Sequence, residues 1–271
     1  MSSILTSILP GGRSSSLSFS LQVLVALLIF ATGSRIYTIT SPFGGLLKLD
    51  TVDVFLPSLI AHRFPLIAGP LPLYSGLFTV AWIVLTTNAF NWFDGIPGQV
   101  NILTVIGATT LGLLALSDRV NQPEVAAIAF VLAACALGGA LFDFPPNRVV
   151  LGDTGAMTYG FLLGALSIYA GGKVATAFLV LGLPLIDAIL VLLRRVLKGE
   201  SLFSGNQDHL HHRLLRRGWS ERQVIALTVV LGTAFGTTAL FLDTWQKFLA
   251  TILLTLIVLW LTWYSKEHRR R

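Results

Sequence analysis

The stretch Asn88-Ala89-Phe90-Asn91-Trp92-Phe93-Asp94-Gly95-Ile96-Pro97-Gly98 decides how the chain is organised, because it interrupts a long apolar run. Asn88, Asn91 and Asp94 are three residues apart, so a helical backbone places them on one face. The segment Gly95–Gly98, with two glycines and a proline, then predicts the end of that helix. A carboxylate and two carboxamides therefore gather at the mouth of a hydrophobic segment, where polar groups are costly and usually functional.

The composition on either side of this stretch is that of a membrane protein. Of the 271 residues, 54% are hydrophobic and 12% are charged, about half the charged share of an ordinary soluble domain. The net charge of +6 is no sign of nucleic-acid binding, because the basic residues cluster at the ends of apolar segments. The single cysteine, Cys135, excludes a disulfide framework. We expect one integral membrane domain over residues 1–271, with a polar N-terminal tail at 1–18.

About eight apolar stretches are long enough to cross a bilayer, which takes about 20 residues. They lie at about 19–36, 73–91, 99–116, 124–142, 155–170, 174–196, 223–242 and 246–264. The segment from Thr38 to Pro72 is rich in proline and glycine, and its alternating residues Leu46–Asp50 predict a short extended or hairpin excursion. The expected fold is all-α, a polytopic bundle of membrane helices with this excursion on the outer side.

The basic residues predict the orientation of the bundle. With the N-terminus in the cytosol, 13 of the 19 lysines and arginines fall on the cytosolic side, in agreement with the positive-inside rule. The loops at 91–99, 143–154 and 197–222 then share that side. All three polar constellations of the chain therefore face the cytosol.

The first constellation, at residues 88–98, contains oxygen ligands, and the second, at residues 147–155, contains the expected start of a helix. Asp94, with Asn88 and Asn91, has the oxygen ligands that Mg²⁺ prefers, although a polar helix end facing headgroup water explains the same residues. Trp92 is expected as an interfacial anchor. The segment Gly152–Gly155, which opens the next span, suits either ordinary helix capping or an anion site.

Three charged residues lie near that helix start or on the following span: Arg148, Asp153 and Asp187. Asp153 is a candidate second metal ligand. Arg148, just before it, can pair with a phosphate or face anionic lipid. Asp187 is an acid inside an expected span, where it either serves the site or pairs with a neighbouring helix.

The third constellation is the histidine-rich loop at 197–222, which contains the run Asp208-His209-Leu210-His211-His212-Arg213. Imidazole suits zinc, but the spacing of the three histidines does not place them on one helical face. A second interpretation is a contact with the phosphates of a nucleotide through the histidines and Arg213. A solvated basic loop is the remaining alternative.

Taken together, these motifs resemble the polyprenyl-phosphate N-acetylhexosamine-1-phosphate transferases, the glycosyltransferase family 4 enzymes that include MraY, WecA and TagO. The resemblance runs from about Leu21 to the C-terminus, and the separate histidine loop is closer to the WecA and TagO branch. The matching segments are Asn88–Gly95, Phe144–Gly155, Pro184–Asp187 and Asp208–Leu215.

The resemblance implies a reaction and a set of partners. A polyprenyl (undecaprenyl) phosphate would attack a UDP-N-acetylhexosamine in the membrane, releasing UMP, with Mg²⁺ or Mn²⁺ as the cofactor. Asp94 and Asp153 would be the catalytic and metal-binding acids. The substrate-binding residues implied are Asn88, Asn91, Arg148, His209, His211, His212 and Arg213. The setting would be a bacterial or archaeal plasma membrane and cell-envelope polysaccharide synthesis, with a homo-oligomer as one arrangement and no nucleic-acid partner.

The chain departs from the family pattern at two places. The family carries an Asp-Asp pair before the helix that Leu21–Ile36 resembles, together with preceding helices, whereas no acidic residue here precedes Asp50. The family also has an aspartate where this chain has Pro97, so the acidic set expected is Asp94 and Asp153. The alternative function is therefore an incomplete or inactive family member that serves as a membrane-embedded binding or assembly partner.

Overall fold

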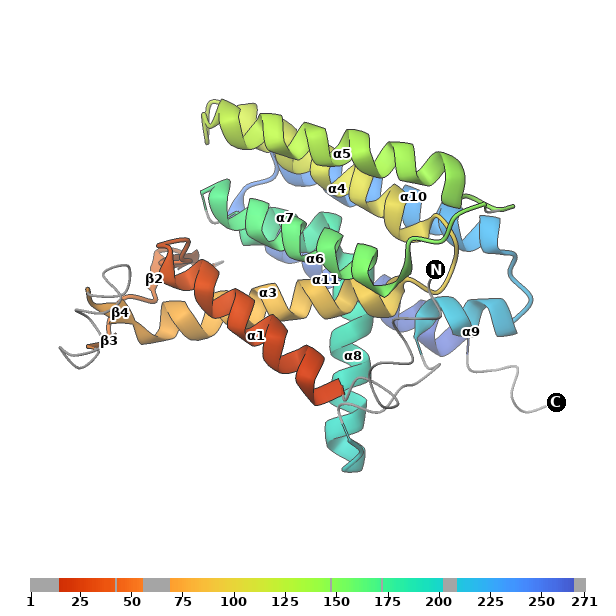
Figure 1. Cartoon of the computed structure of the whole chain (residues 1–271), viewed down its shortest axis with the longest axis horizontal. Helices are drawn as coiled ribbons and strands as arrows, with labels where there is room; N and C mark the ends of the chain where they lie inside the picture. The colour runs from red at the N-terminus through yellow and green to blue at the C-terminus, as the bar shows by residue number, and fades with distance from the viewer. Residues whose placement is uncertain are drawn as a thin grey trace, which may run out of the picture.

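In the computed structural model the chain is a bundle of apolar helices with two small β-ladders at one end (Figure 1). The structure describes residues 15–41, 43–55, 69–146, 148–171, 173–201 and 209–265. Its helices are α1 (Ser15–Ala31), α3 (Leu73–Phe93), α4 (Gln99–Leu116), α5 (Pro123–Asp143), α6 (Gly152–Tyr169), α7 (Val174–Val180), α8 (Gly182–Lys198), α9 (Leu210–Arg216), α10 (Glu221–Phe241) and α11 (Thr244–Tyr264). The expected all-α membrane fold is confirmed.

Two antiparallel ladders follow α1, where the sequence predicts an extended excursion. Strand β1 (Thr38–Thr40) pairs with β2 (Leu46–Lys48), with Ile39 opposite Leu47, and β3 (Asp53–Val54) pairs with β4 (Leu71–Pro72). They lie at the left of Figure 1, at the N-terminal end of α3. Because α3 has 21 residues, these ladders are about 30 Å from its C-terminal end.

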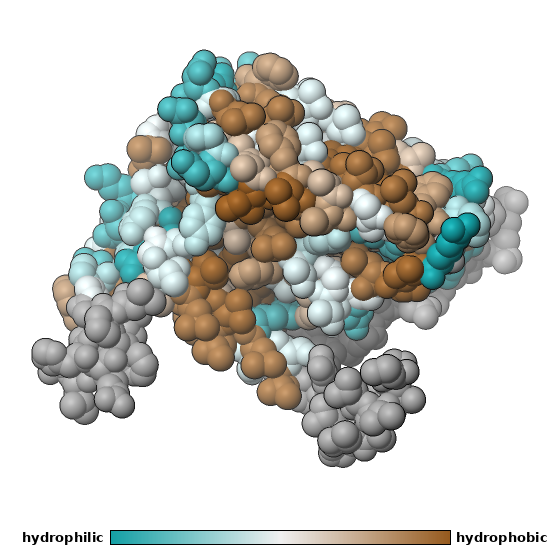
Figure 2. Space-filling model, turned by 45° about the horizontal axis from the view of Figure 1, so that its top comes forward, coloured by the Kyte–Doolittle hydropathy of each residue, from teal (hydrophilic) through white to brown (hydrophobic). Residues whose placement is uncertain are grey.

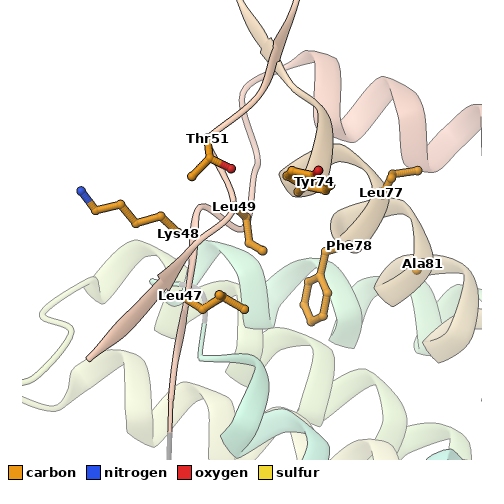
Figure 3. Close-up of a pocket in the computed structure, with 8 residues that line it drawn as sticks. All are labelled: Leu47, Lys48, Leu49, Thr51, Tyr74, Leu77, Phe78 and Ala81. Atoms are coloured by element: carbon orange, nitrogen blue, oxygen red, sulfur yellow. The ribbon is translucent and has the colours of Figure 1, made fainter. Parts of the chain in front are cut away.

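A shallow groove of about 650 Å³ opens between β2 and the first turns of α3 (Figure 3). Leu47, Leu49, Leu77 and Phe78 line it, and nearly all of its surface is apolar. It has no titratable side chain except Lys48 and Tyr74 at its rim. The groove is therefore not the candidate for phosphate chemistry.

Five of the eight expected spans are helices long and apolar enough to cross a membrane, by length and composition: α3, α4, α5, α10 and α11. Two further expected spans, 19–36 and 155–170, are the helices α1 and α6. Of these, α1 is a shorter apolar helix, and α6 begins with the polar residues Gly152-Asp153-Thr154. Figure 2 shows brown, apolar side chains across the middle of the visible face, with hydrophilic residues gathered toward its edges.

The expectation of one continuous helix over 174–196 is wrong. The segment is the pair α7 and α8, which meet at Leu181 with a bend of 90°, so α8 crosses the bundle steeply in Figure 1. Pro184, in the first turn of α8, has no N–H with which to continue the hydrogen-bond ladder of α7. With this pair taken as one span, the described part of the chain has up to six candidate spans.

The helix that carries the Asn88–Gly98 motif is held tightly against α6. A Cβ on Gly160 would lie 2.5 Å from the backbone oxygen of Thr86, so only glycine permits this approach. Trp82 donates from Nε1 to Oγ of Ser167, 2.9 Å away, nearer the other end of the pair. The end of α3 and the start of α6 are thereby fixed side by side.

Candidate functional site

Three carboxylates come together at the end of the bundle opposite the β-ladders. Asp94 caps the C-terminus of α3, Asp143 is the last residue of α5, and Asp153 stands in the first turn of α6. The chain turns between α3 and α4 because Gly98 adopts a left-handed backbone with φ of 81°. The α3 helix ends at Phe93, as the glycines and the proline predict.

The electrostatics of Asp94 show that these acids influence one another. Burial, the largest cause, and the negative charges of Asp143 and Asp153 together raise the pKa of Asp94 to about 6. A carboxylate in such surroundings is held at a cost unless a cation offsets its charge. The geometry therefore favours a positively charged ligand beside Asp94.

The histidine-rich loop covers this end of the bundle through the short helix α9. His211 is 1% exposed, and a Cβ on Gly95 would lie 2.0 Å from its Nε2 atom. Its ring meets Phe93 edge-on at 6.0 Å between centroids, and it lies parallel to the ring of His209 at 6.1 Å. The turn at Asp94 and Gly95 and the ring of His211, 117 residues apart between Asp94 and His211, therefore lie against each other.

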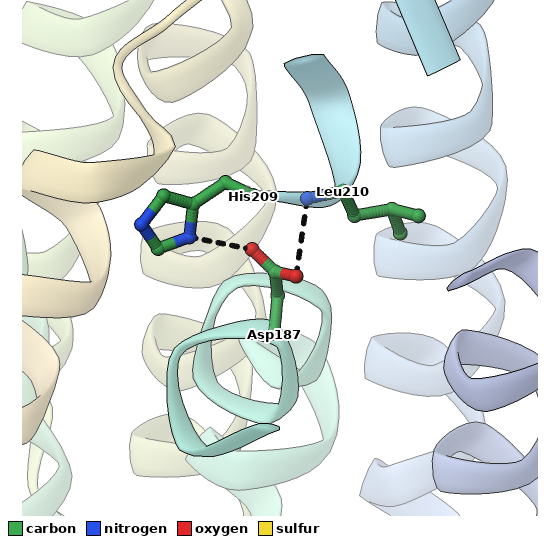
Figure 4. A network of polar contacts seen from close by, with 3 residues as sticks. All are labelled: Asp187, His209 and Leu210. Carbon is green, nitrogen blue, oxygen red and sulfur yellow. Dashed lines mark hydrogen bonds and ion pairs between the residues drawn. The ribbon is translucent and has the colours of Figure 1, made fainter. Parts of the chain in front are cut away.

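Asp187 fixes the start of that helix, as Figure 4 shows. Nδ1 of His209 donates to Oδ2 of Asp187 at 2.8 Å, and the backbone N–H of Leu210 donates to Oδ1 at 3.1 Å. An ionised carboxylate only accepts, so this geometry places the ring proton on Nδ1 of His209. Of the two roles considered for Asp187, the structure shows the pairing role, with a loop as its partner.

Trp92 belongs to the same contact network. It stacks on the ring of His209 at 5.7 Å between centroids. The interfacial-anchor interpretation therefore leaves out its contact with the histidine loop.

Several buried polar atoms at this end have no hydrogen-bond partner among the described residues. They are Nδ2 of Asn91, Oδ1 of Asp143, and both ring nitrogens of His211. Buried polar groups are nearly always hydrogen-bonded in proteins. Several unpartnered polar atoms close together are typical of a binding site for a polar ligand.

Burial also keeps His211 from adding positive charge to the site. Burial, the largest cause, and the neighbouring groups His212, His209 and Arg216 together lower the pKa of His211 to about 3. Burial lowers the pKa of His212 as well. At neutral pH, His211 is therefore an uncharged hydrogen-bonding group, and positive charge for a phosphate has to come from arginine or a cation.

The remaining candidate residues differ in their hydrogen bonds and in their exposure. Asn88 donates from Nδ2 to Gln22 on α1 and to the carbonyl of Val84, and thus ties α3 to α1. Arg148 is exposed in the loop between α5 and α6, and Arg213 is half-buried on α9. Asp208 lies outside the described residues.

No ready-made metal site exists in the described part of the chain, where no three histidine, cysteine or acidic side chains are grouped closely enough to hold an ion. Mg²⁺ seldom needs such a cage, because it keeps several waters and takes one or two carboxylates together with substrate phosphates. The raised pKa of Asp94 and the unpartnered oxygen of Asp143 fit an oxygen-coordinated cation that binds with its substrate.

Two polar residues here went unnoticed in the sequence. Asp143, 3% exposed, and Asn101, 1% exposed, are joined by a hydrogen bond of 2.7 Å from Nδ2 of Asn101 to Oδ2 of Asp143. Their position could have indicated a functional role, since both are polar residues at the ends of apolar runs. Asp143 was hidden because it directly precedes the Phe144–Gly155 motif.

The architecture and the site define a polytopic helical membrane protein with acids, amides and histidines gathered at one end of its bundle. Comparison with known families is decisive at this point: the model of glycosyl transferase family 4 matches residues 14–171. The chain belongs to this family, as its motifs predict.

Curated relatives carry the same assignment. The chain is 30% identical over 254 residues to a probable undecaprenyl-phosphate N-acetylglucosaminyl 1-phosphate transferase of Bacillus subtilis, which covers 92% of the chain and 63% of that protein. It is 33% identical over 175 residues to a decaprenyl-phosphate N-acetylglucosaminephosphotransferase of Mycobacterium leprae, covering 56% and 44%. An undecaprenyl-phosphate alpha-N-acetylglucosaminyl 1-phosphate transferase of Escherichia coli O157:H7 is 29% identical over 195 residues, covering 68% and 52%. The chain thus spans less than two thirds of each relative's length.

Proposed function

We propose that this chain transfers N-acetylhexosamine-1-phosphate from a UDP-sugar to a polyprenyl phosphate, such as undecaprenyl phosphate, and releases UMP. The observation that supports the proposal is the packing of His211 against Gly95, next to Asp94, whose pKa the charge of Asp153 helps to raise. The relatives' names describe the same transfer to undecaprenyl or decaprenyl phosphate. The product would enter cell-envelope polysaccharide synthesis.

The reaction needs positioning and charge neutralisation more than covalent help from the protein. An oxygen of the lipid phosphate forms a bond to the β-phosphorus of the UDP-sugar, and the bond from that phosphorus to the bridging oxygen breaks as UMP leaves. A phosphate monoester has a second pKa of about 6 and is largely ionised at pH 7. The nucleophile is therefore ready without a strong general base, so site residues chiefly orient the two phosphates.

The side chains divide this work by their chemistry. Asp94 and Asp153 would hold Mg²⁺, or Mn²⁺ in its place. When bound, the cation offsets the charge that builds up on the departing UMP. Neutral His211 would offer hydrogen bonds from a ring whose nitrogens have no protein partner in the described residues.

The other candidates surround that centre. Arg148 and Arg213 would contact phosphate oxygens, which the planar guanidinium suits. His209 and His212 would complete the nucleotide side, with His209 held by Asp187. Asn91 has a buried Nδ2 atom without a partner in the described residues, and Asn88 supports the wall from α1.

The active end would face the cytoplasm of a bacterial or archaeal cell, across its plasma membrane. The positive-inside distribution supports this orientation, and it is the side on which nucleotide sugars are made. The lipid phosphate would arrive laterally from the inner leaflet. The proposed partners are the UDP-sugar and the lipid phosphate, without nucleic acid, and a homo-oligomer is one arrangement of the chain.

UMP release tests the proposal directly. Membranes containing the whole chain are supplied with undecaprenyl phosphate, UDP-N-acetylglucosamine and Mg²⁺, and UMP and a lipid-linked sugar are measured. We expect both products to require Mg²⁺ and to disappear with Asp153→Asn. The absence of products, in a preparation where the B. subtilis relative is active, would overturn the proposal for this chain.

Pro97 favours a second candidate, a binding protein without turnover. The family pattern has an aspartate at this position, and removing a carboxylate that places a cation would slow the chemistry more than the binding. The second candidate predicts that the chain binds UDP-N-acetylglucosamine but yields no UMP. The same assay, run beside a measurement of nucleotide-sugar binding, separates the two.

A further inference from the structure

A cluster of basic side chains lies at the β-ladder end of the bundle, away from the candidate functional site. Arg119 is in the connection between α4 and α5, Lys173 precedes the first residue of α7, and Lys247 is near the start of α11. The α4–α5 connection is at the left of Figure 1, at the same end as the ladders. Helix α7 packs against both α4 and α11, and the positive charges of Lys173 and Arg119 both act on Lys247. The three basic groups are therefore neighbours.

Lys247 is a half-buried cation with little to offset its charge. Its Nζ atom donates to Oγ1 of the fully buried Thr176 at 2.8 Å. An ammonium has three N–H donors, and this hydroxyl is an uncharged acceptor that takes one of them. In the part of the chain that the structure describes, no carboxylate forms an ion pair with Lys247. A charged side chain in a membrane helix is costly and usually functional.

The surrounding charges leave this place positive. Lys173 is half-buried and Arg119 is exposed, and the acid that acts on Lys247 is Asp243, the exposed residue before α11. Three positive charges therefore face one negative charge. Like charges held close together repel each other, so an anion among the three basic groups would be stabilised.

Aromatic side chains indicate the depth of the cluster in the membrane. Phe43, in the turn between β1 and β2, lies 5.9 Å from Trp245 and 6.1 Å from Phe248 between ring centroids. Both partners are on α11, on either side of Lys247 in the sequence. Aromatic residues gather at the level of the lipid headgroups, where the anions are phosphate groups.

The position of the cluster also runs against the general distribution of charge. In the expected orientation, this end of the bundle is the outer one and has six of the 19 lysines and arginines. Three of those six are in this cluster. Because basic residues are depleted on the outer side of membrane proteins, three of them at one place indicate a ligand.

We propose that Arg119, Lys173 and Lys247 form a binding site for the phosphate group of an anionic phospholipid, in the leaflet at the β-ladder end of the bundle. The two ammonium groups would contact the phosphate as point charges, and the guanidinium would offer paired donors. Such a lipid would hold together the ends of α4, α7 and α11. The inference is independent of the proposed transfer, which takes place at the other end of the molecule.

Native mass spectrometry of the whole chain, purified in detergent and titrated with phosphatidylglycerol, tests this proposal. We expect a variant with Arg119→Gln, Lys173→Gln and Lys247→Gln together to bind one phosphatidylglycerol fewer than the wild type. Lys247→Gln alone, which keeps a donor for Thr176, should weaken that binding by about 5-fold, the effect of one basic residue near a membrane surface. Lys48→Gln, at an exposed position on β2 at the same end, is the matched control and should bind as the wild type does.

A variant with the opposite effect guards against misfolding. Asp243→Asn removes the one negative charge that acts on Lys247, and asparagine caps a helix about as well as aspartate. Its binding of phosphatidylglycerol should tighten by a few-fold, which a damaged protein would not do. Lys247→Arg keeps the charge and should stay within a few-fold of the wild type. Thermal unfolding shows whether each variant retains the fold.

The outcomes distinguish a specific lipid site from its alternatives. Equal losses in Lys247→Gln and Lys48→Gln would mean diffuse attraction to a charged surface and would overturn the proposal. Equal binding of the zwitterionic lipid phosphatidylcholine would overturn it as well. If inorganic phosphate binds at these residues but phosphatidylglycerol does not, the ligand is a soluble anion and the lipid assignment is wrong. Failure of UMP release would overturn the proposed transfer and leave the lipid measurement unaffected.

Discussion

His209 and Asp187 are joined by a hydrogen bond of 2.8 Å, and this bond anchors the histidine loop to the helix that follows the break in the bundle. Both side chains are almost fully buried, at 7% and 6% exposed. Because the N–H of Leu210 donates to the other oxygen of Asp187, the start of α9 is held at two residues, His209 and Leu210. His211 directly follows Leu210, so its orientation depends on this anchor.

Replacing Asp187 should therefore loosen the loop in proportion to the bonds lost. Asp187→Leu leaves two buried N–H groups unpaired, each at a cost of about 1–3 kcal/mol, whereas Asp187→Asn can still accept one of them. We expect the leucine variant to unfold at lower temperature than the asparagine variant, and both to bind UDP-N-acetylglucosamine more weakly than the wild type. Thermal unfolding in detergent and nucleotide-sugar titration measure the two effects.

Glu200→Gln provides the control for that series. Glu200 forms a 3.7 Å ion pair with Lys198 at the exposed end of α8, and exposed pairs contribute little to stability. This variant should behave as the wild type does in both measurements. Equal stability of the wild type and Asp187→Leu would contradict the anchoring role.

Gly95 tests whether α9 packs on the end of α3 as the structure shows. Gly95→Ala places a Cβ 2.0 Å from Nε2 of His211, and such overpacking costs about 1–3 kcal/mol of stability. In the His211→Ala background the same change should cost almost nothing, because the ring is absent. The interaction energy from this double-mutant cycle, measured by thermal or detergent unfolding, should be clearly non-zero.

An additive result would speak against that contact. If Gly95→Ala destabilises the protein equally with and without the His211 ring, the cause is the backbone of the turn. The histidine loop would then lie elsewhere in solution.

Much of this arrangement could be predicted from residue patterns. The polar set at 88–94, followed by two glycines and a proline, correctly indicated a helix end, and apolar length located most of the spans. The break at Leu181 was missed because hydropathy sums over 174–196 do not register a change of direction. Pro184 was a visible warning, but prolines also occur in continuous membrane helices.

The site residues that lie in local sequence motifs were predictable, whereas contacts between distant segments were not. Asp94, Asp153 and the histidines lie in recognisable motifs. The hydrogen bond from Gly98 to Asp143 instead forms because the turn after α3 packs against the end of α5. These two residues are 45 residues apart in the chain. The local sequence does not indicate from which backbone N–H a buried carboxylate will accept a hydrogen bond.

The close approach of α3 and α6 leads to a third prediction. Gly160→Ala would place a Cβ 2.5 Å from the backbone oxygen of Thr86 and 2.9 Å from Cβ of Phe90, and neither atom can move without shifting α3. We expect a loss of about 1–3 kcal/mol in stability. Gly138→Ala, on α5 with nothing within 4 Å of the added atom, should be neutral or stabilising by up to about 1 kcal/mol.

The comparison of these two alanines is informative because both glycines lie within helices. Thermal unfolding of the two variants under identical detergent conditions supplies the measurement. If Gly160→Ala is as stable as Gly138→Ala, the α3–α6 interface is looser than the structure indicates. The alignment of Asp94 with Asp153 would then lose its support.

The last prediction concerns acid and follows from the burial of His211. Its pKa in the folded protein is lowered to about 3 from 6.5, with burial the main cause. As the pH falls below 6.5, the unfolded chain takes up a proton at this residue while the folded protein does not, so stability declines until the pH approaches 3. The slope from this one residue is at most about 1.4 kcal/mol per pH unit. His211→Gln removes the titrating group, so its unfolding free energy should fall less steeply than that of the wild type between pH 6.5 and 4. Parallel curves for the two proteins would mean that His211 is protonated in the folded state, and hence that water reaches its ring.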